Sequence, residues 1–199
     1  MHKYLPNTFI FLDQYNNQIF ENKNHNIGVI YRNYKDRERE KQLVKIAKAC
    51  KKSGYQLFVS NDLKLALKVK ANGIYVPSFN KTKNFSNLEK KNITILGSAH
   101  NQKEIQRKIS QNCCAIFLSP VFNVEKSKKF LGLYKFNYLS RMNKINILAL
   151  GGISENNIRK LKLLYIKGFG GISIFKKKPA FFKGRFFFED ADTSKTFNI

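Results

Sequence analysis

Two glycine pairs near the end of the chain are the strongest chemical signal in the sequence. The first lies in Leu150-Gly151-Gly152-Ile153-Ser154, where bare backbone N–H groups before an expected helix favour a phosphate or another anion. The second, Gly170-Gly171, leads through Ser173 to another turn, and Lys176 adds a positive charge there. Glycine pairs also serve tight turns. Barrel enzymes often bind phosphate after their last two strands, so the two pairs together favour a phosphate site.

Other polar residues follow short apolar runs that are typical of strands. Where parallel strands close into a barrel, reactive groups project from the carboxyl ends of those strands. His100 in such a position is a candidate general acid or base, and a helix-capping role fits it equally well. The 125–129 loop (EKSKK) is either a lid over an anionic ligand or a solvated loop. The full set of strand-end candidates is Asp13, Arg32, Asn33, Asn61, Asp62, Ser78, Asn80, Ser98, His100, Ser119, the loop 123–129, Gly151-Gly152 and Ser173–Lys176.

Metal ligands are sparse in this sequence. The three histidines are far apart along the chain, and no Cys/His pair has the spacing of zinc ligands. Only Asp13, Asp62 and Glu125 supply carboxylates near the expected strand ends, where a hard cation needs several. The residues alone therefore predict an anion site rather than a metal centre.

The elements that must position these residues form an alternation of apolar and amphipathic segments. Continuously apolar strands between helices predict a parallel sheet covered by helices. An open doubly wound sheet and a closed (β/α)8 barrel share this pattern, and eight units favour the α/β TIM barrel. The strands are expected at Thr8–Leu12, Ile27–Tyr31, Gln56–Ser60, Ile74–Val76, Ile93–Leu96, Cys114–Leu118, Ile147–Leu150 and Phe169–Ile174.

Amphipathic stretches between these strands predict the helices. One helix is expected over Asp36–Lys52, and another begins at Asn101 with Ile105 and Ile109 on its buried face. Ser154 is expected to cap a helix that bears Ile158, Leu161 and Tyr165. Residues 16–26 leave room only for a short first helix. A single barrel domain is expected over residues 1–178, followed by an irregular Phe-rich tail over 179–199.

The charge balance is strongly basic. The 199 residues include 37 Lys and Arg and 13 Asp and Glu, which gives a formal net charge of +24. Such a charge is typical of proteins that bind nucleic acid or another polyanion. The lysines are spread over nearly every helical segment, however, so a compositional bias on solvated faces explains most of them. Nucleic acid therefore remains the less favoured partner.

The cysteines and the hydropathy of the chain indicate where in the cell the protein is expected. No apolar run reaches the roughly 18 residues of a spanning helix, and the N-terminus does not resemble a signal peptide. Cys50, Cys113 and Cys114 provide no disulfide framework and are interpreted as small core residues. These features predict a cytoplasmic protein that does not enter the membrane. They leave a homo-oligomer open.

Four short motifs occur in a fixed order along the chain. They are ILGSAH (Ile95–His100), FLSPVF (Phe117–Phe122), LALGGI (Leu148–Ile153) and GFGGIS (Gly168–Ser173). Tyr31-Arg32 and the stretch from residue 58 to 75 fit the same pattern. From about residue 8 to residue 176, the chain resembles the thiamine phosphate synthase and thiazole tautomerase superfamily. This resemblance implies the closed barrel.

The resemblance also implies an activity and its residues. It implies a transferase of thiamine biosynthesis that joins hydroxymethylpyrimidine diphosphate to a thiazole phosphate carboxylate and releases pyrophosphate and CO₂, with Mg²⁺ as cofactor. By position, Arg32 and Lys128 would hold the pyrophosphate and Ser98 would line the site. The thiazole phosphate would be bound by Gly151, Gly152 and the backbone at Phe175 and Lys176.

The sequence departs from this family at the expected metal ligands. Asn61 and Asn80 stand where the synthases place Mg²⁺-binding aspartates, and Asp62 lies one position away. Tyr34 stands in place of an expected lysine, and Pro120 in place of the tautomerase histidine. An amide oxygen coordinates Mg²⁺ more weakly than a carboxylate. Three functions therefore stay open: a synthase-like enzyme acting on phosphorylated small molecules, a catalytically inactive module that binds phosphorylated ligands, and a polyanion binder.

Overall fold

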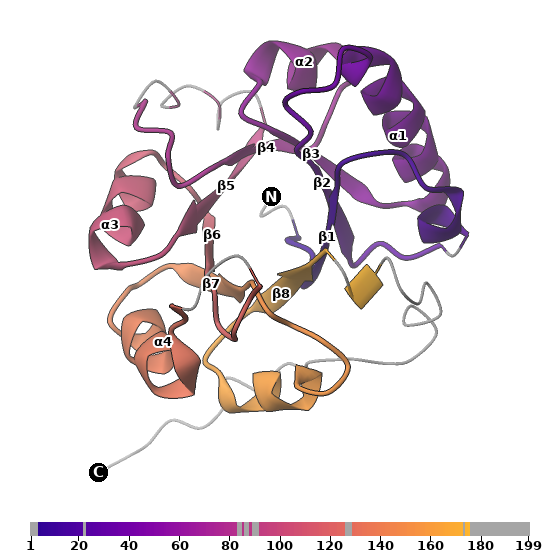
Figure 1. Ribbon diagram of the computed structural model, residues 1–199. Coiled ribbons are helices and arrows are strands. Elements are labelled where there is room, and N and C mark those ends of the chain that lie inside the picture. The colour runs from indigo at the N-terminus through magenta and orange to yellow at the C-terminus, as the bar shows by residue number, and fades with distance from the viewer. Residues whose placement is uncertain are drawn as a thin grey trace.

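Eight parallel strands close into one barrel (Figure 1). Each strand is hydrogen-bonded to the next, and the first pairs with the last, so the predicted (β/α)8 barrel is confirmed. The computed structural model describes residues 4–21, 23–82, 85, 88, 92–125, 129–172 and 174–175. The expected tail over 179–199 and the boundary at residue 178 lie outside these residues.

The strands are almost continuously buried because helices cover their outer faces and side chains fill the barrel. All five positions of the second strand are buried, for example. The fifth strand runs to Ala99, so Ser98 lies within it and His100 follows directly. The strands are β1 (Thr8–Leu12), β2 (Ile27–Tyr31), β3 (Gln56–Ser60), β4 (Gly73–Val76), β5 (Thr94–Ala99), β6 (Ala115–Leu118), β7 (Asn146–Ala149) and β8 (Gly168–Gly171).

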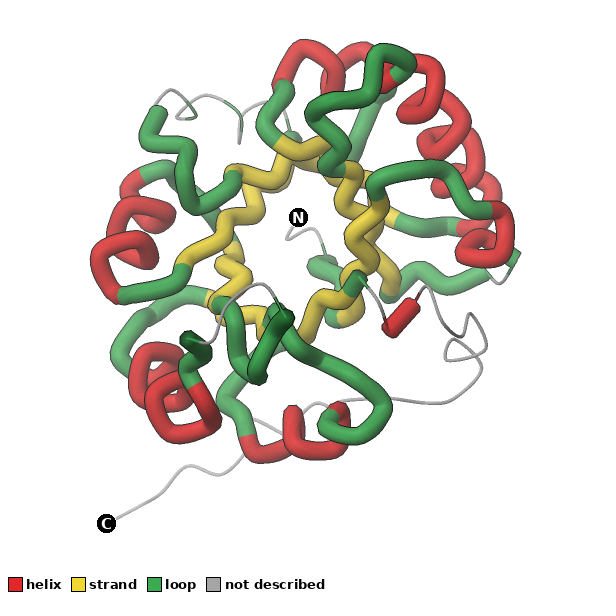
Figure 2. Tube along the Cα trace, in the orientation of Figure 1, coloured by secondary structure: helices red, strands yellow, loops and turns green. Residues whose placement is uncertain are grey.

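Helices form a ring around the outside of the strands (Figure 2). The short first helix that was expected is a single 3₁₀ turn, η1, and α1 ends at Gly54 in the left-handed conformation with φ of 74°. Gly54 thereby closes α1 as a C-terminal cap. The helices are η1 (Asn17–Phe20), α1 (Arg39–Ser53), α2 (Leu63–Lys68), α3 (Gln102–Ser110), α4 (Gly132–Arg141) and η3 (Ile158–Leu163).

Some predicted boundaries are wrong, and local side chains explain two of them. The helix expected from Asp36 begins at Arg39, because Asp36 Oδ1 accepts the Glu38 N–H at 2.8 Å and forms a turn. The helix expected from Ser154 is the shorter 3₁₀ helix η3, and Tyr165 lies beyond it with 58% of its surface exposed. The last strand ends at Gly171, three residues earlier than expected.

The barrel interior is filled by aromatic rings. Phe9, Phe11, Tyr75 and Phe117 meet edge to face, with ring centroids 5.1 to 5.9 Å apart. Gly28 admits one of these rings, since a Cβ there would lie 2.4 Å from Phe9 Cδ1. The interior is therefore a packed core, and chemistry is confined to the barrel ends.

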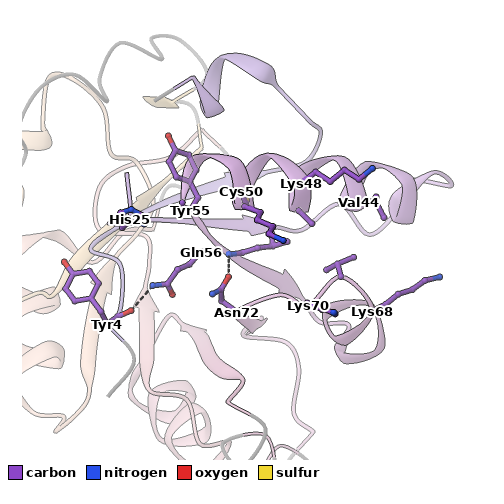
Figure 3. A pocket seen from close by; sticks show the side chains of 15 residues that line it. Tyr4, His25, Val44, Lys48, Cys50, Tyr55, Gln56, Lys68, Lys70 and Asn72 are labelled. Carbon is purple, nitrogen blue, oxygen red and sulfur yellow. Dashed lines mark hydrogen bonds between the residues drawn. The ribbon is translucent and has the colours of Figure 1, made fainter. Parts of the chain in front are cut away.

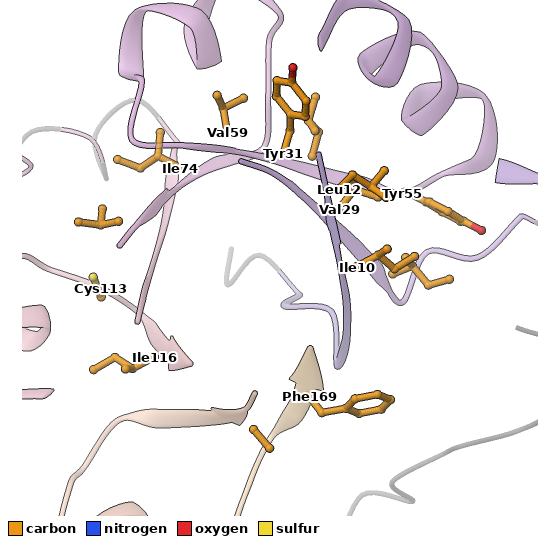
Figure 4. Close-up of a cluster of buried hydrophobic side chains, with 14 of the residues drawn as sticks. Ile10, Leu12, Val29, Tyr31, Tyr55, Val59, Ile74, Cys113, Ile116 and Phe169 are labelled. Atoms are coloured by element: carbon orange, nitrogen blue, oxygen red, sulfur yellow. The ribbon is translucent and has the colours of Figure 1, made fainter. Parts of the chain in front are cut away.

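A second apolar cluster lies between the strands and the helices (Figure 4). Tyr31, Val59 and Ile74 belong to it, and so do the buried thiols of Cys50 and Cys113. Burial raises the pKa of each of these two thiols to about 12. Cys114 is exposed, so its predicted core role is wrong: alternation along the chain turns it away from Cys113.

The buried face of α3 also differs from the prediction. Ile105 is buried as expected, but Ile109 has 37% of its surface exposed and Lys108 is fully buried in its place.

Within the described part of the chain, no helix is long and apolar enough to cross a membrane.

Candidate functional site

Arg32 stands at the carboxyl end of β2, where the resemblance places a pyrophosphate ligand. Its Nε donates to Asp13 Oδ1 at 3.1 Å, and its guanidinium lies 5.8 Å from the centre of the Phe11 ring. Both charged side chains are more than a third exposed. The guanidinium has five N–H donors in a planar fork that suits an oxyanion. Arg32 is thus a cation at the barrel mouth that is positioned by Asp13 and partly accessible to solvent.

The two asparagines at the expected metal positions meet in space. Asn80 Nδ2 donates to Oδ1 of Asn61, which adopts the left-handed conformation at φ of 56°. Asp62 does not join them. Its Oδ1 accepts the Leu65 N–H at 2.9 Å as the cap of α2, and its Oδ2 pairs with Arg39 at 3.1 Å. Both oxygens of this carboxylate are therefore already bound.

These donors do not fit a Mg²⁺ ion. The Asn61 amide oxygen is already an acceptor for Asn80, and the nearest carboxylate, on Asp62, holds a helix and an arginine. Hard divalent cations prefer several free oxygens with negative charge. Among the described residues, no group of three His, Cys, Asp or Glu side chains is arranged to hold a metal ion.

An aromatic pair occupies the same end of the barrel. Tyr34, which replaces an expected lysine, bonds through its hydroxyl to Ser60 Oγ, and its ring meets Phe79 edge to face at 6.3 Å. Burial raises the pKa of Tyr34, so its hydroxyl stays neutral at ordinary pH. Phe79 is 65% exposed. This part of the mouth therefore offers ring surface where a lysine was expected, and the guanidinium of Arg39 lies 5.6 Å from the centre of the Tyr34 ring.

Ser98 faces inward rather than into the open mouth. It is 5% exposed, and its side chain is hydrogen-bonded to Tyr75 within the barrel. Burial raises the pKa of Tyr75 to about 12. Ser98 therefore lies at the floor of the mouth.

The first glycine pair has a clear structural cause. Gly151 and Gly152 adopt φ of 90° and 72°, and a Cβ on Gly152 would lie 2.5 Å from the carbonyl oxygen of Asn123. A Cβ on Gly151 would lie 2.7 Å from Pro120 Cβ. The pair thus lets the turn after β7 pack against the loop after β6, as the tight-turn alternative requires.

The helix expected to follow this pair does not begin directly after it. η3 begins at Ile158, six residues after Gly152, and the intervening segment closes on itself. Asn157 Nδ2 donates to the Gly152 carbonyl at 2.8 Å, and its Oδ1 accepts the Ser154 N–H at 2.9 Å. The Ser154 N–H is therefore already used, and the phosphate site stays a prediction that rests on the glycine backbone itself.

Replacing Gly152 with alanine is expected to destabilise the protein by about 3 kcal/mol, because it combines a left-handed backbone with a close approach. Gly132 is a matched control: its φ is 68°, but its added Cβ would meet nothing closer than 4.0 Å. Gly132→Ala should cost only the backbone strain, about 1 kcal/mol. Urea unfolding of both variants gives the comparison, and equal losses would refute the packing explanation.

Phe175 belongs to the outer core. It is 3% exposed, and its ring stacks on Phe169 with centroids 6.2 Å apart. Its ring is thus a packing group, and its predicted phosphate contact through the backbone stays untested. Lys128 and Lys176, the two lysines expected at the phosphates, lie outside the described residues.

Lys108 is the residue of this region that sequence reasoning missed. Its Nζ donates to the carbonyls of Pro77 and Asn80 at 2.6 and 3.0 Å, and to Gln111 Oε1 at 2.9 Å. These three acceptors match the three N–H donors of an ammonium group. Lys108 therefore ties the loop that carries Asn80 to α3. A lysine three residues after buried Ile105 is the signal that could have revealed it.

A cavity of about 900 Å³ lies at the opposite ends of the strands (Figure 3). Gln56 and Asn72, at the amino ends of β3 and β4, line it together with residues of α1. It is remote from the strand ends that carry Arg32 and Asn61 and therefore forms no part of the candidate site.

Known proteins resemble this chain in sequence and in fold. A family model described as thiamine monophosphate synthase matches residues 23–175. A thiamine-phosphate synthase of Prochlorococcus marinus subsp. pastoris is 31% identical over 137 residues, which are 64% of this chain and 37% of that protein. The counterpart in another Prochlorococcus marinus strain is 33% identical over 127 residues, 61% of this chain and 36% of that protein.

The solved structures agree on the barrel. The thiamine phosphate pyrophosphorylase of Pyrococcus furiosus superposes with a TM-score of 0.69 at 19% identity, covering 85% of this chain and 86% of that one. The chain spans little more than a third of the length of the curated relatives. The family model nevertheless extends from before β2 to the end of the described barrel. This chain therefore belongs to the thiamine monophosphate synthase family.

Proposed function

We propose that this barrel binds hydroxymethylpyrimidine diphosphate and a thiazole phosphate at its mouth and joins them as a thiamine-phosphate synthase. The observation that carries the proposal is Arg32, held at the carboxyl end of β2 by Asp13 with its guanidinium accessible. A diphosphate leaving group gains negative charge as its bond to carbon breaks. A preorganised guanidinium stabilises that charge.

The remaining diphosphate charge has to be balanced by other cations of this chain. Asn61 and Asn80 contribute no positive charge, and the carboxylate of Asp62 is engaged by the Leu65 N–H and by Arg39. The 126–129 loop supplies three lysines in the sequence, of which Lys128 is the one that the family pattern assigns to the pyrophosphate. Arg32 and these lysines are the proposed diphosphate ligands.

The reaction itself is tested with the purified full chain and both substrates, with and without Mg²⁺, by following thiamine phosphate. Product formation is expected. Its absence from folded protein would contradict the synthase proposal. The amide contact between Asn61 and Asn80 favours a second candidate, a module that binds phosphorylated ligands without turnover. Calorimetry with inorganic pyrophosphate, read together with the product assay, separates the two, since both candidates bind pyrophosphate and only the synthase forms thiamine phosphate.

Replacing Arg32 with alanine is expected to weaken pyrophosphate binding by about 10- to 100-fold, which corresponds to one or two charge-assisted hydrogen bonds. Arg37→Ala is the matched control, because Arg37 is an exposed arginine of the following loop. Calorimetry on both variants gives the comparison. If both lose the same affinity, diffuse positive charge rather than Arg32 holds the ligand.

A further inference from the structure

Ser78 and His100 form a hydrogen-bonded pair at the mouth, outside the residues assigned to the proposed synthase reaction. Ser78 lies two residues after β4, and His100 follows β5 directly. Ser78 Oγ and His100 Nε2 are 3.2 Å apart, within the range of a nucleophile and its base. We propose that His100 activates Ser78 as a nucleophile that accepts acyl groups from small carboxylic esters.

The partner of the second ring nitrogen determines which tautomer His100 adopts. Nδ1 lies 2.8 Å from the carbonyl oxygen of Ser119, which can only accept a hydrogen bond, and 3.3 Å from the Ser119 hydroxyl, which can accept one as well. Nδ1 therefore carries the proton of the neutral ring, and Nε2 presents its lone pair to Ser78. The Ser78 hydroxyl must then donate to Nε2. This is the arrangement in which a serine is deprotonated as it attacks, with the Ser119 carbonyl orienting the base.

The backbone around Ser78 is held at both ends. Asn80 N–H donates to the Pro77 carbonyl at 3.0 Å, which closes a turn with Ser78 and Phe79 at its centre. Lys108 Nζ binds the carbonyls of both Pro77 and Asn80. Ser78 therefore lies on a turn whose two ends are hydrogen-bonded to the buried ammonium of Lys108. Preorganisation of this kind lowers the entropic cost of attack.

The surroundings favour an ester with an apolar or aromatic part. Ser78 is partly accessible, and the neighbouring Phe79 ring is 65% exposed. Tyr34 packs against that ring and extends the apolar surface. Aryl esters of short carboxylic acids have both the electrophilic carbonyl and the ring that this surface suits.

The reaction balances with water as the co-reactant. Ser78 Oγ forms a bond to the ester carbonyl carbon while its proton moves to His100 Nε2. The bond from carbon to the leaving oxygen then breaks, and His100 returns the proton to that oxygen. Water attacks the acyl-serine, gives a proton to His100, and releases the acid as Ser78 Oγ recovers a proton. The products are one carboxylic acid and one alcohol.

A fluorophosphonate probe tests the nucleophile on the full chain without any synthase substrate. Ser78 Oγ should form a bond to phosphorus as fluoride leaves, so intact mass should show one phosphonyl group, and peptide mapping should place it on Ser78. Hydrolysis of 4-nitrophenyl acetate should follow the same pattern. Ser78→Ala should abolish both signals, and His100→Gln should slow both by about 100-fold.

Ser110→Ala is the control, because Ser110 is an exposed serine whose hydroxyl donates to the Arg107 carbonyl at 2.8 Å. It should label and hydrolyse like the wild type. Absence of labelling in folded wild type, or labelling that persists in Ser78→Ala, would overturn the proposal. Neither result depends on thiamine phosphate formation, so failure of the synthase proposal is measured separately.

Discussion

Replacing Lys108 with methionine is expected to lower the free energy of unfolding by about 3 kcal/mol, because buried acceptors lose their donor. Lys108 is fully buried and bonds to two carbonyls of the loop after β4 and to Gln111. Methionine keeps the length of the side chain and removes only the ammonium. The variant therefore measures what the hydrogen bonds of the ammonium contribute to stability, with little change in packing.

The effect should be concentrated in the loop over residues 77–82. Hydrogen exchange is expected to rise there, since Lys108 and Gln111 bind its carbonyls at Pro77, Asn80 and Thr82. Lys103→Met on the same helix is the control, because Lys103 is exposed and its loss should change stability by less than about 0.5 kcal/mol. Equal stability of the two variants in urea would contradict the anchoring role.

The same lysine gives the protein a pH dependence. Burial lowers the pKa of Lys108 from 10.5 to about 8, while Glu104 and Cys113 oppose this shift and Arg107 adds to it. Between these two values the unfolded chain binds more protons than the folded chain, so stability rises with pH. The wild type should therefore gain stability relative to Lys108→Met from pH 8 to about pH 10. Urea unfolding at pH 7 and 9.5 measures the difference, and a gap that narrows would contradict the shift.

Replacing both Asn61 and Asn80 with aspartate is expected to raise Mg²⁺-dependent turnover at least about tenfold, if the diphosphate reaction is the one proposed. The two side chains already touch, so the double variant Asn61→Asp/Asn80→Asp places two carboxylates side by side. Two neighbouring carboxylates repel each other and together attract a divalent cation. The cation would then balance diphosphate charge that we propose Arg32 and the loop lysines balance in the natural chain.

Calorimetry with Mg²⁺ alone gives a readout that does not depend on turnover. The double variant should bind Mg²⁺, and without Mg²⁺ it should lose about 1 kcal/mol of stability from like-charge repulsion. Asn146→Asp, at the exposed amino end of β7, is the control for a charge change away from the mouth. A double variant that binds no more Mg²⁺ than this control would refute the geometric argument.

The strands of the barrel were predictable because burial on both faces makes each strand a continuous apolar run. Each strand of a helix-covered parallel sheet is apolar on both faces, so runs such as Ile27–Tyr31 identify themselves without knowledge of their neighbours. The structure differs from the predicted elements where a single side chain forms hydrogen bonds that a local sequence pattern does not predict. Asn157 closes a turn in place of the helix expected at Ser154, and Lys108 enters the core because loop carbonyls satisfy its ammonium.

The candidate site was predictable as a set of strand ends but not as a set of contacts. The sequence by itself determined the α/β class and the eight strand segments, and it placed Arg32, Asn61 and Asn80 after strand ends, because each of these features depends on short segments. Only the tertiary structure decided that Asn61 bonds to Asn80, that Asp62 is bound elsewhere, and that Ser78 meets His100. Asn61 and Asn80 are 19 residues apart in the sequence, and Ser78 and His100 are 22 residues apart. Their meeting depends on barrel closure and on strand register, which no local pattern encodes.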